Sequence, residues 1–73
     1  MPRPVLTKHV RERMEERDIA EEQIYAALAH EIRRTPGQPG TVWIHGLVAG
    51  GETLKVCVSV DLGKIVTAAW PGR

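Results

Sequence analysis

The stretch that decides the fold is Thr53-Leu-Lys-Val-Cys-Val-Ser-Val60. Its large apolar residues fall at every second position: Leu54, Val56, Val58 and Val60. Such alternation is typical of a β-strand with one face in the core. We therefore expect these four residues to be buried, and Lys55, Cys57 and Ser59 to lie on the opposite face.

Working outward from this strand, the sequence predicts an α+β domain. Further strands are expected at 41–48 and 64–70, and turns that contain glycine, at 49–52 and 61–64, separate them from the strand at 53–60. A short edge strand is expected at 32–34. Residues 35–40, Thr-Pro-Gly-Gln-Pro-Gly, predict a loop. Upstream, apolar residues at helical spacing predict helices over about 7–17, with Thr7 as N-cap, and 21–30. The prediction is a single domain, residues 1–73, with two N-terminal helices packed on a three- to four-stranded antiparallel β-meander.

The register of the last hairpin is open at this stage. A two-residue turn places Thr67 on the core face, whereas a three-residue loop with Gly63 near a bulge places it beside Lys55. We favour the longer loop because it buries Val66, Ala68 and Trp70 together with the valines.

Composition excludes several classes of protein. The 73 residues carry 10 Lys+Arg and 9 Asp+Glu, a net charge of +1, so binding of nucleic acid by bulk positive charge is excluded. One cysteine excludes an internal disulfide framework. No apolar run is long enough for a membrane span and no signal-peptide core is visible, so we expect a cytoplasmic protein without membrane contact. The few large residues predict a thin core, which makes burial in a homodimer an expectation.

Two groups of residues carry candidate chemistry. In the first helix His9, Arg13 and Arg17 follow one another at intervals of four and share one helical edge. A histidine takes or gives protons near neutral pH, and arginine matches phosphate oxygens, so this edge could hold a phosphodiester. The same residues also fit an amphipathic helix whose charged flanks only cover apolar surface.

The second group lies on the predicted sheet. Lys55 faces away from the valines with His45 and Trp43, joined by Thr67 if the last hairpin has the longer loop. Lysine could stabilise charge in a transition state, and Trp43 could stack on a base. An exposed polar sheet face and a packed tryptophan explain the same residues without function. The histidines lack metal-ligand spacing, and we predict no metal and no cofactor.

The order of motifs resembles a bacterial family. The opening Leu6-Thr-Lys-His-Val-Arg-Glu-Arg-Met-Glu-Glu-Arg-Asp-Ile19, the strand Leu54-Lys-Val56 and the closing Ile65-Val-Thr-Ala68 resemble the domain of unknown function 4258. Asp18 and Ala20 depart from the glycine and serine that this family prefers at those sites. The family in turn resembles small ribonuclease toxins of the RelE/ParE, barnase and colicin type.

The resemblance implies a metal-independent, toxin-like endoribonuclease that leaves a 2′,3′-cyclic phosphate. It assigns catalysis to His9, Arg13, Lys55 and Thr67, and we expect Arg17, Trp43 and His45 to bind substrate. The partners would then be RNA and an antitoxin. The alternative is a non-catalytic interaction module on the same fold, which binds itself or another protein through the Val10–Met14 edge or through the sheet.

Overall fold

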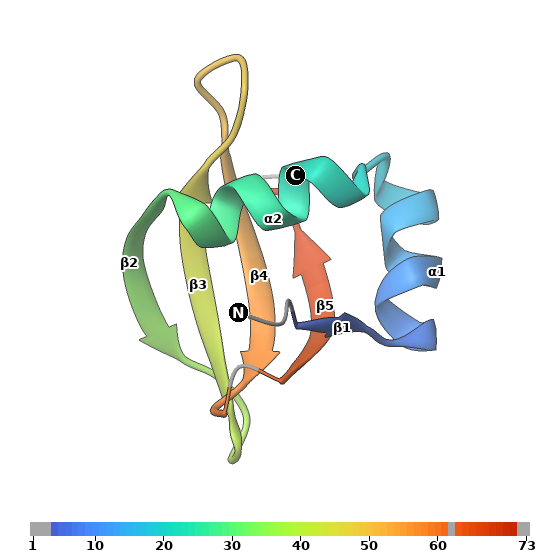
Figure 1. Ribbon diagram of the computed structural model, residues 1–73, viewed down its shortest axis with the longest axis vertical. Coiled ribbons are helices and arrows are strands. Elements are labelled where there is room, and N and C mark those ends of the chain that lie inside the picture. Colours follow the sequence, from blue (N-terminus) through green and yellow to red (C-terminus); the bar gives the residue numbers. More distant parts are fainter. Residues whose placement is uncertain (1–3, 62, 72–73) are drawn as a thin grey trace.

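A five-stranded sheet organises the protein, and two helices pack against it (Figure 1). The computed structural model describes residues 4–61 and 63–71. Its elements, in chain order, are β1 Val5–Leu6, α1 Lys8–Arg17, α2 Glu21–Ala29, β2 Glu31–Pro36, β3 Thr41–Leu47, β4 Thr53–Ser59 and β5 Lys64–Ala69. The predicted α+β class is confirmed.

Both helices begin and end close to the predicted limits. The Thr7 hydroxyl accepts a hydrogen bond from the Val10 N–H, as expected of an N-cap, and donates one to the Ile65 carbonyl. Ala20 has no acceptor to cap α2, but the Gln23 side chain reaches back and accepts a hydrogen bond from the Ala20 N–H. One half of a capping box therefore compensates for the missing serine.

Asp18 ends α1 in the left-handed conformation, with φ 54° and ψ 52°. Glycine adopts this geometry without steric cost, and a carboxylate at a helix C-terminus opposes the helix dipole. We expect Asp18→Gly to raise the free energy of unfolding by about 0.5–1 kcal/mol, measured by urea denaturation. Asp18→Ala should lower it, and equal stabilities of the two variants would contradict this account.

The sheet has the strand order β1-β5-β4-β3-β2 and is mixed rather than wholly antiparallel. The predicted meander is present in β2 to β5, but β1 adds a fifth strand that runs parallel to β5, with Val5 opposite Lys64 and Leu6 opposite Ile65. A two-residue strand is too short to show a periodicity, so no local pattern indicates it.

The edge strand β2 is longer than predicted. A loop is expected at Thr35 and Pro36, but these residues pair with Trp43 and Val42 of β3. Proline lacks an N–H to donate, and an edge strand tolerates this because its outer side needs no partner. The turn therefore begins only after Pro36, where the Gln38 carbonyl accepts hydrogen bonds from the Thr41 N–H and hydroxyl.

A β-bulge in β5 resolves the register of the last hairpin. Thr67 pairs with Cys57, but Ile65 pairs with Val58, which leaves Val66 as the extra residue. Ile65 and Ala68 are both buried, while Val66 is only half-buried. Thr67 therefore lies on the Lys55 face, as favoured, but the prediction that Val66 joins the core is wrong.

The turn before β5 is held by side chains. The Asp61 carboxylate accepts hydrogen bonds from the Ser59 hydroxyl (2.6 Å) and the Gly63 N–H (2.9 Å). These two bonds, the first above all, lower the pKa of Asp61. Residue 62 of the predicted turn lies outside the described residues.

The core lies between the helices and the sheet, and the alternation of β4 places three of its four predicted residues there. Leu54, Val56 and Val58 are fully buried. Val60, predicted to join them, is 66% exposed. The reason is that β4 ends at Ser59, and the Val60 N–H donates to the Gly40 carbonyl outside the sheet.

Gly46 allows α2 to approach the sheet closely. A β-carbon at this position would overlap the backbone of Ala27 in α2. Gly46 therefore faces the helix, and its neighbour His45 faces the opposite side of the sheet. This places the helix-free surface of the sheet, called the open face below, on the side of His45.

Candidate functional site

Four of the predicted site residues lie on the open face, in two rows that cross the strands. The first row runs Arg33, His45, Lys55 and Ala69, from β2 to β5. The second runs Thr35, Trp43, Cys57 and Thr67. Residues opposite one another on neighbouring strands share a face, so the pairing brings together His45, Lys55, Trp43 and Thr67.

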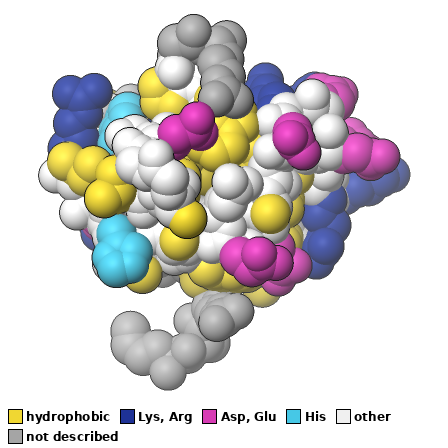
Figure 2. Space-filling view, turned by 90° about the horizontal axis from the view of Figure 1, so that it is seen from above, with side chains coloured by type: hydrophobic (Ala, Val, Ile, Leu, Met, Phe, Trp, Pro, Cys, Tyr) yellow, Lys and Arg dark blue, Asp and Glu magenta, His cyan; other side chains and the backbone are white. Residues whose placement is uncertain are grey.

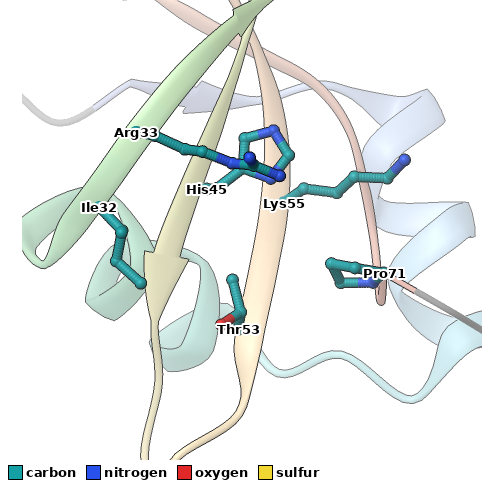
Figure 3. Close-up of a pocket in the computed structure, with 6 residues that line it drawn as sticks. All are labelled: Ile32, Arg33, His45, Thr53, Lys55 and Pro71. Atoms are coloured by element: carbon teal, nitrogen blue, oxygen red, sulfur yellow. The ribbon is translucent and has the colours of Figure 1, made fainter.

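The first row borders a cavity of about 640 Å³. It is lined by Ile32, Arg33, His45, Thr53, Lys55 and Pro71. Figure 3 shows the Arg33 side chain reaching the His45 ring on the open face, while the Lys55 side chain extends away from that ring, with the helices behind the sheet. Arg33 and Lys55 belong to the two strands on either side of the strand that carries His45, and neighbouring strands are about 4.8 Å apart. The cavity therefore brings two cations and a titratable ring to one part of the open face.

The electrostatics of His45 follow from this position. Burial lowers the pKa of His45 first, and the charges of Arg33 and Lys55 lower it further. His45 Nε2 also shares a hydrogen bond with the Thr35 hydroxyl at 3.0 Å. The imidazole is therefore held in place and favours its neutral form, in which one ring nitrogen has a free lone pair.

The lowered pKa of His45 predicts a pH-dependent stability. The unfolded chain binds a proton near the ordinary histidine pKa of about 6.5, whereas the folded chain resists protonation to lower pH. The free energy of unfolding is therefore fully retained above this pH and falls as the pH drops toward the folded pKa. In His45→Gln, the part of this decrease in the free energy of unfolding that comes from His45 should be absent. Urea denaturation between pH 8 and 5 tests this, and identical pH profiles for both proteins would contradict it.

The second row is packed rather than open. Cys57 is 5% exposed although it lies on the open face, because Trp43 and Thr67 stand on either side of it. The ammonium of Lys55 lies 4.8 Å from the centre of the Trp43 ring, a cation–π contact. Cys57 is thus a packed residue, and Trp43 covers it while holding Lys55.

The α1 residues occupy a different place. α1 packs against β5, at the opposite end of the sheet from β2 (Figure 1). His9 is exposed and Arg13 forms an ion pair with Glu16. Within residues 4–61 and 63–71, no hydrogen bond or ion pair joins His9, Arg13 or Arg17 to the side chains of the open face.

Arg17 has a structural partner. Its guanidinium donates to the Ala68 carbonyl (2.7 Å), and its own carbonyl accepts from the Trp70 indole N–H (2.9 Å). Ala68 lies beyond the two residues of β5 that pair with β1. Arg17 therefore provides a hydrogen-bond donor for a β5 carbonyl at a position where β1 has ended. Its two hydrogen bonds also connect the end of α1 to the end of the sheet.

Basic and acidic side chains are mixed over the surface. Figure 2 shows Lys and Arg side chains at both the left and the right, with the acidic side chains toward the middle and right. α1 carries Lys8, Arg11, Arg13 and Arg17 beside Glu12, Glu15 and Glu16. The positive charge of the open face is therefore a local feature of Arg33 and Lys55.

The family of the chain is shown by a match over almost its whole length. The model of the family described as Domain of unknown function (DUF4258) matches residues 6–70. The chain belongs to this family. The match covers both helices and all of the sheet except Val5, so α1 and the open face are parts of one DUF4258 domain. No curated protein and no solved structure matches the chain, and the likeness to RelE and barnase stays a prediction.

Two residues of the open face, Arg33 and Thr35, are not among the site residues predicted from the sequence. The sequence pattern predicts only an edge strand for Arg33 and a loop for Thr35. The signal for Arg33 is the predicted edge strand itself, since pairing with 41–48 brings it next to His45. Thr35 has no such signal, because the Pro and Gly residues after it indicate a loop.

Two further findings concern metals and membranes. Over residues 4–61 and 63–71, no group of three or more His, Cys, Asp or Glu side chains is placed to hold a metal ion. In the same part of the chain, neither helix is long and apolar enough to cross a membrane.

Proposed function

We propose that this DUF4258 domain is a metal-independent endoribonuclease whose site is the cavity of the open face. The observation that carries the proposal is the placement of His45 between Arg33 and Lys55 in a cavity, with its ring tethered by the Thr35 hydroxyl. A neutral imidazole that accepts a proton beside two cations suits the cleavage of a phosphodiester. The cytoplasm is the expected location, since RNA is the substrate.

The step is an attack of the ribose 2′-oxygen on its own phosphate. With Nε2–H donating to Thr35, the free nitrogen of His45 takes the proton of the 2′-hydroxyl. The 2′-oxygen then bonds to phosphorus and the bond from phosphorus to the 5′-oxygen breaks. The 5′-oxygen takes a proton from water, so the products are a 2′,3′-cyclic phosphate and a 5′-hydroxyl.

The cations act on the phosphate. Negative charge builds on its oxygens as the new bond forms, and Arg33 and Lys55 lie where they stabilise that charge. Lys55 is held over Trp43 by the cation–π contact, so its ammonium is oriented before substrate binds. Thr67 lies one strand from Cys57 in the second row, at the rim of the same face.

This proposal gives His45 the role of base that the resemblance assigns to His9. The reason is that His9 is exposed on α1, while His45 lies among the cations that would hold the phosphate. His9, Arg13 and Arg17 keep their predicted roles only if substituting them slows cleavage more than substituting His45 does.

The test is incubation of the purified chain with total RNA in EDTA, followed by identification of the new ends. We expect fragments with 2′,3′-cyclic phosphate and 5′-hydroxyl ends, and their loss in Lys55→Met. Intact RNA at high protein concentration would refute the proposal. The matched control is Lys64→Met, because Lys64 is exposed at the start of β5 outside the cavity.

A second candidate is a non-catalytic interaction module, and the free side of β2 favours it. In the described part of the chain β2 pairs only with β3, which leaves its outer side available for a strand of a second copy or an antitoxin. The Val10–Met14 edge is not available, because Val10 is fully buried and Met14 packs on the core. A stable homodimer by light scattering, together with intact RNA, would favour this candidate over the enzyme.

A further inference from the structure

The cavity of the open face has two unlike halves. Arg33, His45 and Lys55 form a cationic half, and Ile32, Thr53 and Pro71 form a half without charge. Figure 3 shows this division, with Ile32, Thr53 and Pro71 displaced together along the strands from the charged row. A site for phosphate alone needs only the first half.

We propose that the uncharged half is a base-binding subsite, so that the cavity takes one nucleotide with its phosphate on Arg33 and Lys55 and its base between Ile32 and Pro71. The inference rests on the proposed function and deepens it. It makes the substrate a single-stranded RNA whose base is unpaired and turned onto the sheet.

The spacing fits one nucleotide. Thr53 precedes Lys55 by two residues in β4, so the two side chains share the open face and are about 6.8 Å apart along the strand. The spacing between these two positions of the strand matches the reach from a phosphate across its ribose to the base. The Lys55 ammonium lies over Trp43, on the side away from Thr53. A phosphate beside Arg33 and His45, which Lys55 meets from the Trp43 side, thus places the base over Thr53, whose hydroxyl is available for a hydrogen bond.

The apolar walls of this half are exposed to solvent. Ile32 is 61% exposed, because it is the extra residue of an irregularity in β2 between Glu31 and Arg33. What distinguishes Ile32 from the other exposed apolar residues is that it lines the cavity beside the cationic row, where a flat, partly apolar anion would cover it. Pro71 supplies a second flat surface across the cavity.

Negative charge beyond the uncharged half sets the direction of binding. A smaller cavity of about 230 Å³ continues from Thr53 and Pro71 and is lined also by Glu52 and Trp70. The Glu52 carboxylate repels a phosphate at this end, whereas a base carries no charge and tolerates it. The phosphate is therefore directed to Arg33 and Lys55, and the base to the other end.

The test compares three probes that the enzyme cannot cleave: 2′-deoxyadenosine 5′-monophosphate, 2-deoxyribose 5-phosphate and inorganic phosphate. Dissociation constants come from titrations followed by NMR, with the Ile32 methyl signals as a local reporter. We expect the nucleotide to bind about tenfold more tightly than the sugar phosphate, because its base covers apolar surface of Ile32 and Pro71, and to shift the Ile32 methyl signals. Ile32→Asn should remove most of that preference while leaving the sugar phosphate affinity unchanged.

Val60→Asn is the matched control, because Val60 is equally exposed but lies outside the cavity; it should keep the full preference. Equal affinities for nucleotide and sugar phosphate, or unshifted Ile32 signals, would overturn the base subsite. If the base subsite were overturned in this way but RNA cleavage still depended on Lys55, the proposed function would stand without a base subsite. If no probe bound and no RNA were cut, both would fail.

Discussion

Substitution of His45 by alanine is expected to slow RNA cleavage by about 10²–10⁴-fold, the usual contribution of a general base. His45 lies between Arg33 and Lys55 with its ring held by Thr35, so no other group that lines the described cavity can replace it. The measurement is the rate of fragment formation from a defined single-stranded RNA in EDTA. His45 is only half-buried, so the variant should still fold, which its urea denaturation checks directly.

Two other histidines make this experiment decisive. His30→Ala is the control, because His30 ends α2 and is exposed outside the cavity. His9→Ala tests the role implied by the family motif. Loss of cleavage in His9→Ala with normal cleavage in His45→Ala would move the base to α1 and contradict the site on the open face.

The substitution Gly46→Ala is expected to lower the free energy of unfolding by about 3 kcal/mol, the upper part of the range for overpacking a core. The added methyl group would overlap the Ala27 backbone, and a helix backbone cannot move aside as a flexible side chain can. α2 must therefore shift away from β3 and loosen the buried contacts of Ile24 and Leu54. Small domains have about 5–15 kcal/mol of stability in total, so this loss is large.

Urea denaturation followed by circular dichroism measures the effect. Leu47→Ala is the matched control, because Leu47 is the next residue of β3 but is exposed; its effect should stay within about 0.5 kcal/mol. A Gly46→Ala protein within about 1 kcal/mol of the wild type, the mean effect of a point substitution, would show that α2 does not need the glycine.

Most strands and turns of the antiparallel part are predicted because their signals are local. The alternation in β4, the N-cap Thr7 and the glycine turns each depend on a few neighbouring residues. The parts that were missed depend on distant residues. β1 exists because Val5 and Leu6 meet β5, and the bulge at Val66 exists because Ile65 and Ala68 must both reach the core. Neither constraint is visible in a short window.

The candidate site divides in the same way. Strand periodicity alone puts Trp43, His45 and Lys55 on one face, and the bulge in β5 then decides the face of Thr67. The helix edge that carries His9 and Arg17 is equally regular, but periodicity within one element cannot tell where that element packs. Arg17 illustrates this, since its partner, the Ala68 carbonyl, is 51 residues away along the chain.

The pairing of β1 with β5 also bears on how the chain reaches its native state. Leu6 meets Ile65, and the Thr7 hydroxyl bonds to the Ile65 carbonyl 58 residues away. During synthesis, α1 leaves the ribosome long before the strand on which it docks, so its buried residue Val10 must wait for the end of the domain. Contacts so distant in the chain are slow to form because loop closure comes first. The hairpins of β2 to β5 should therefore assemble early, and β1 and α1 should join the folded protein last.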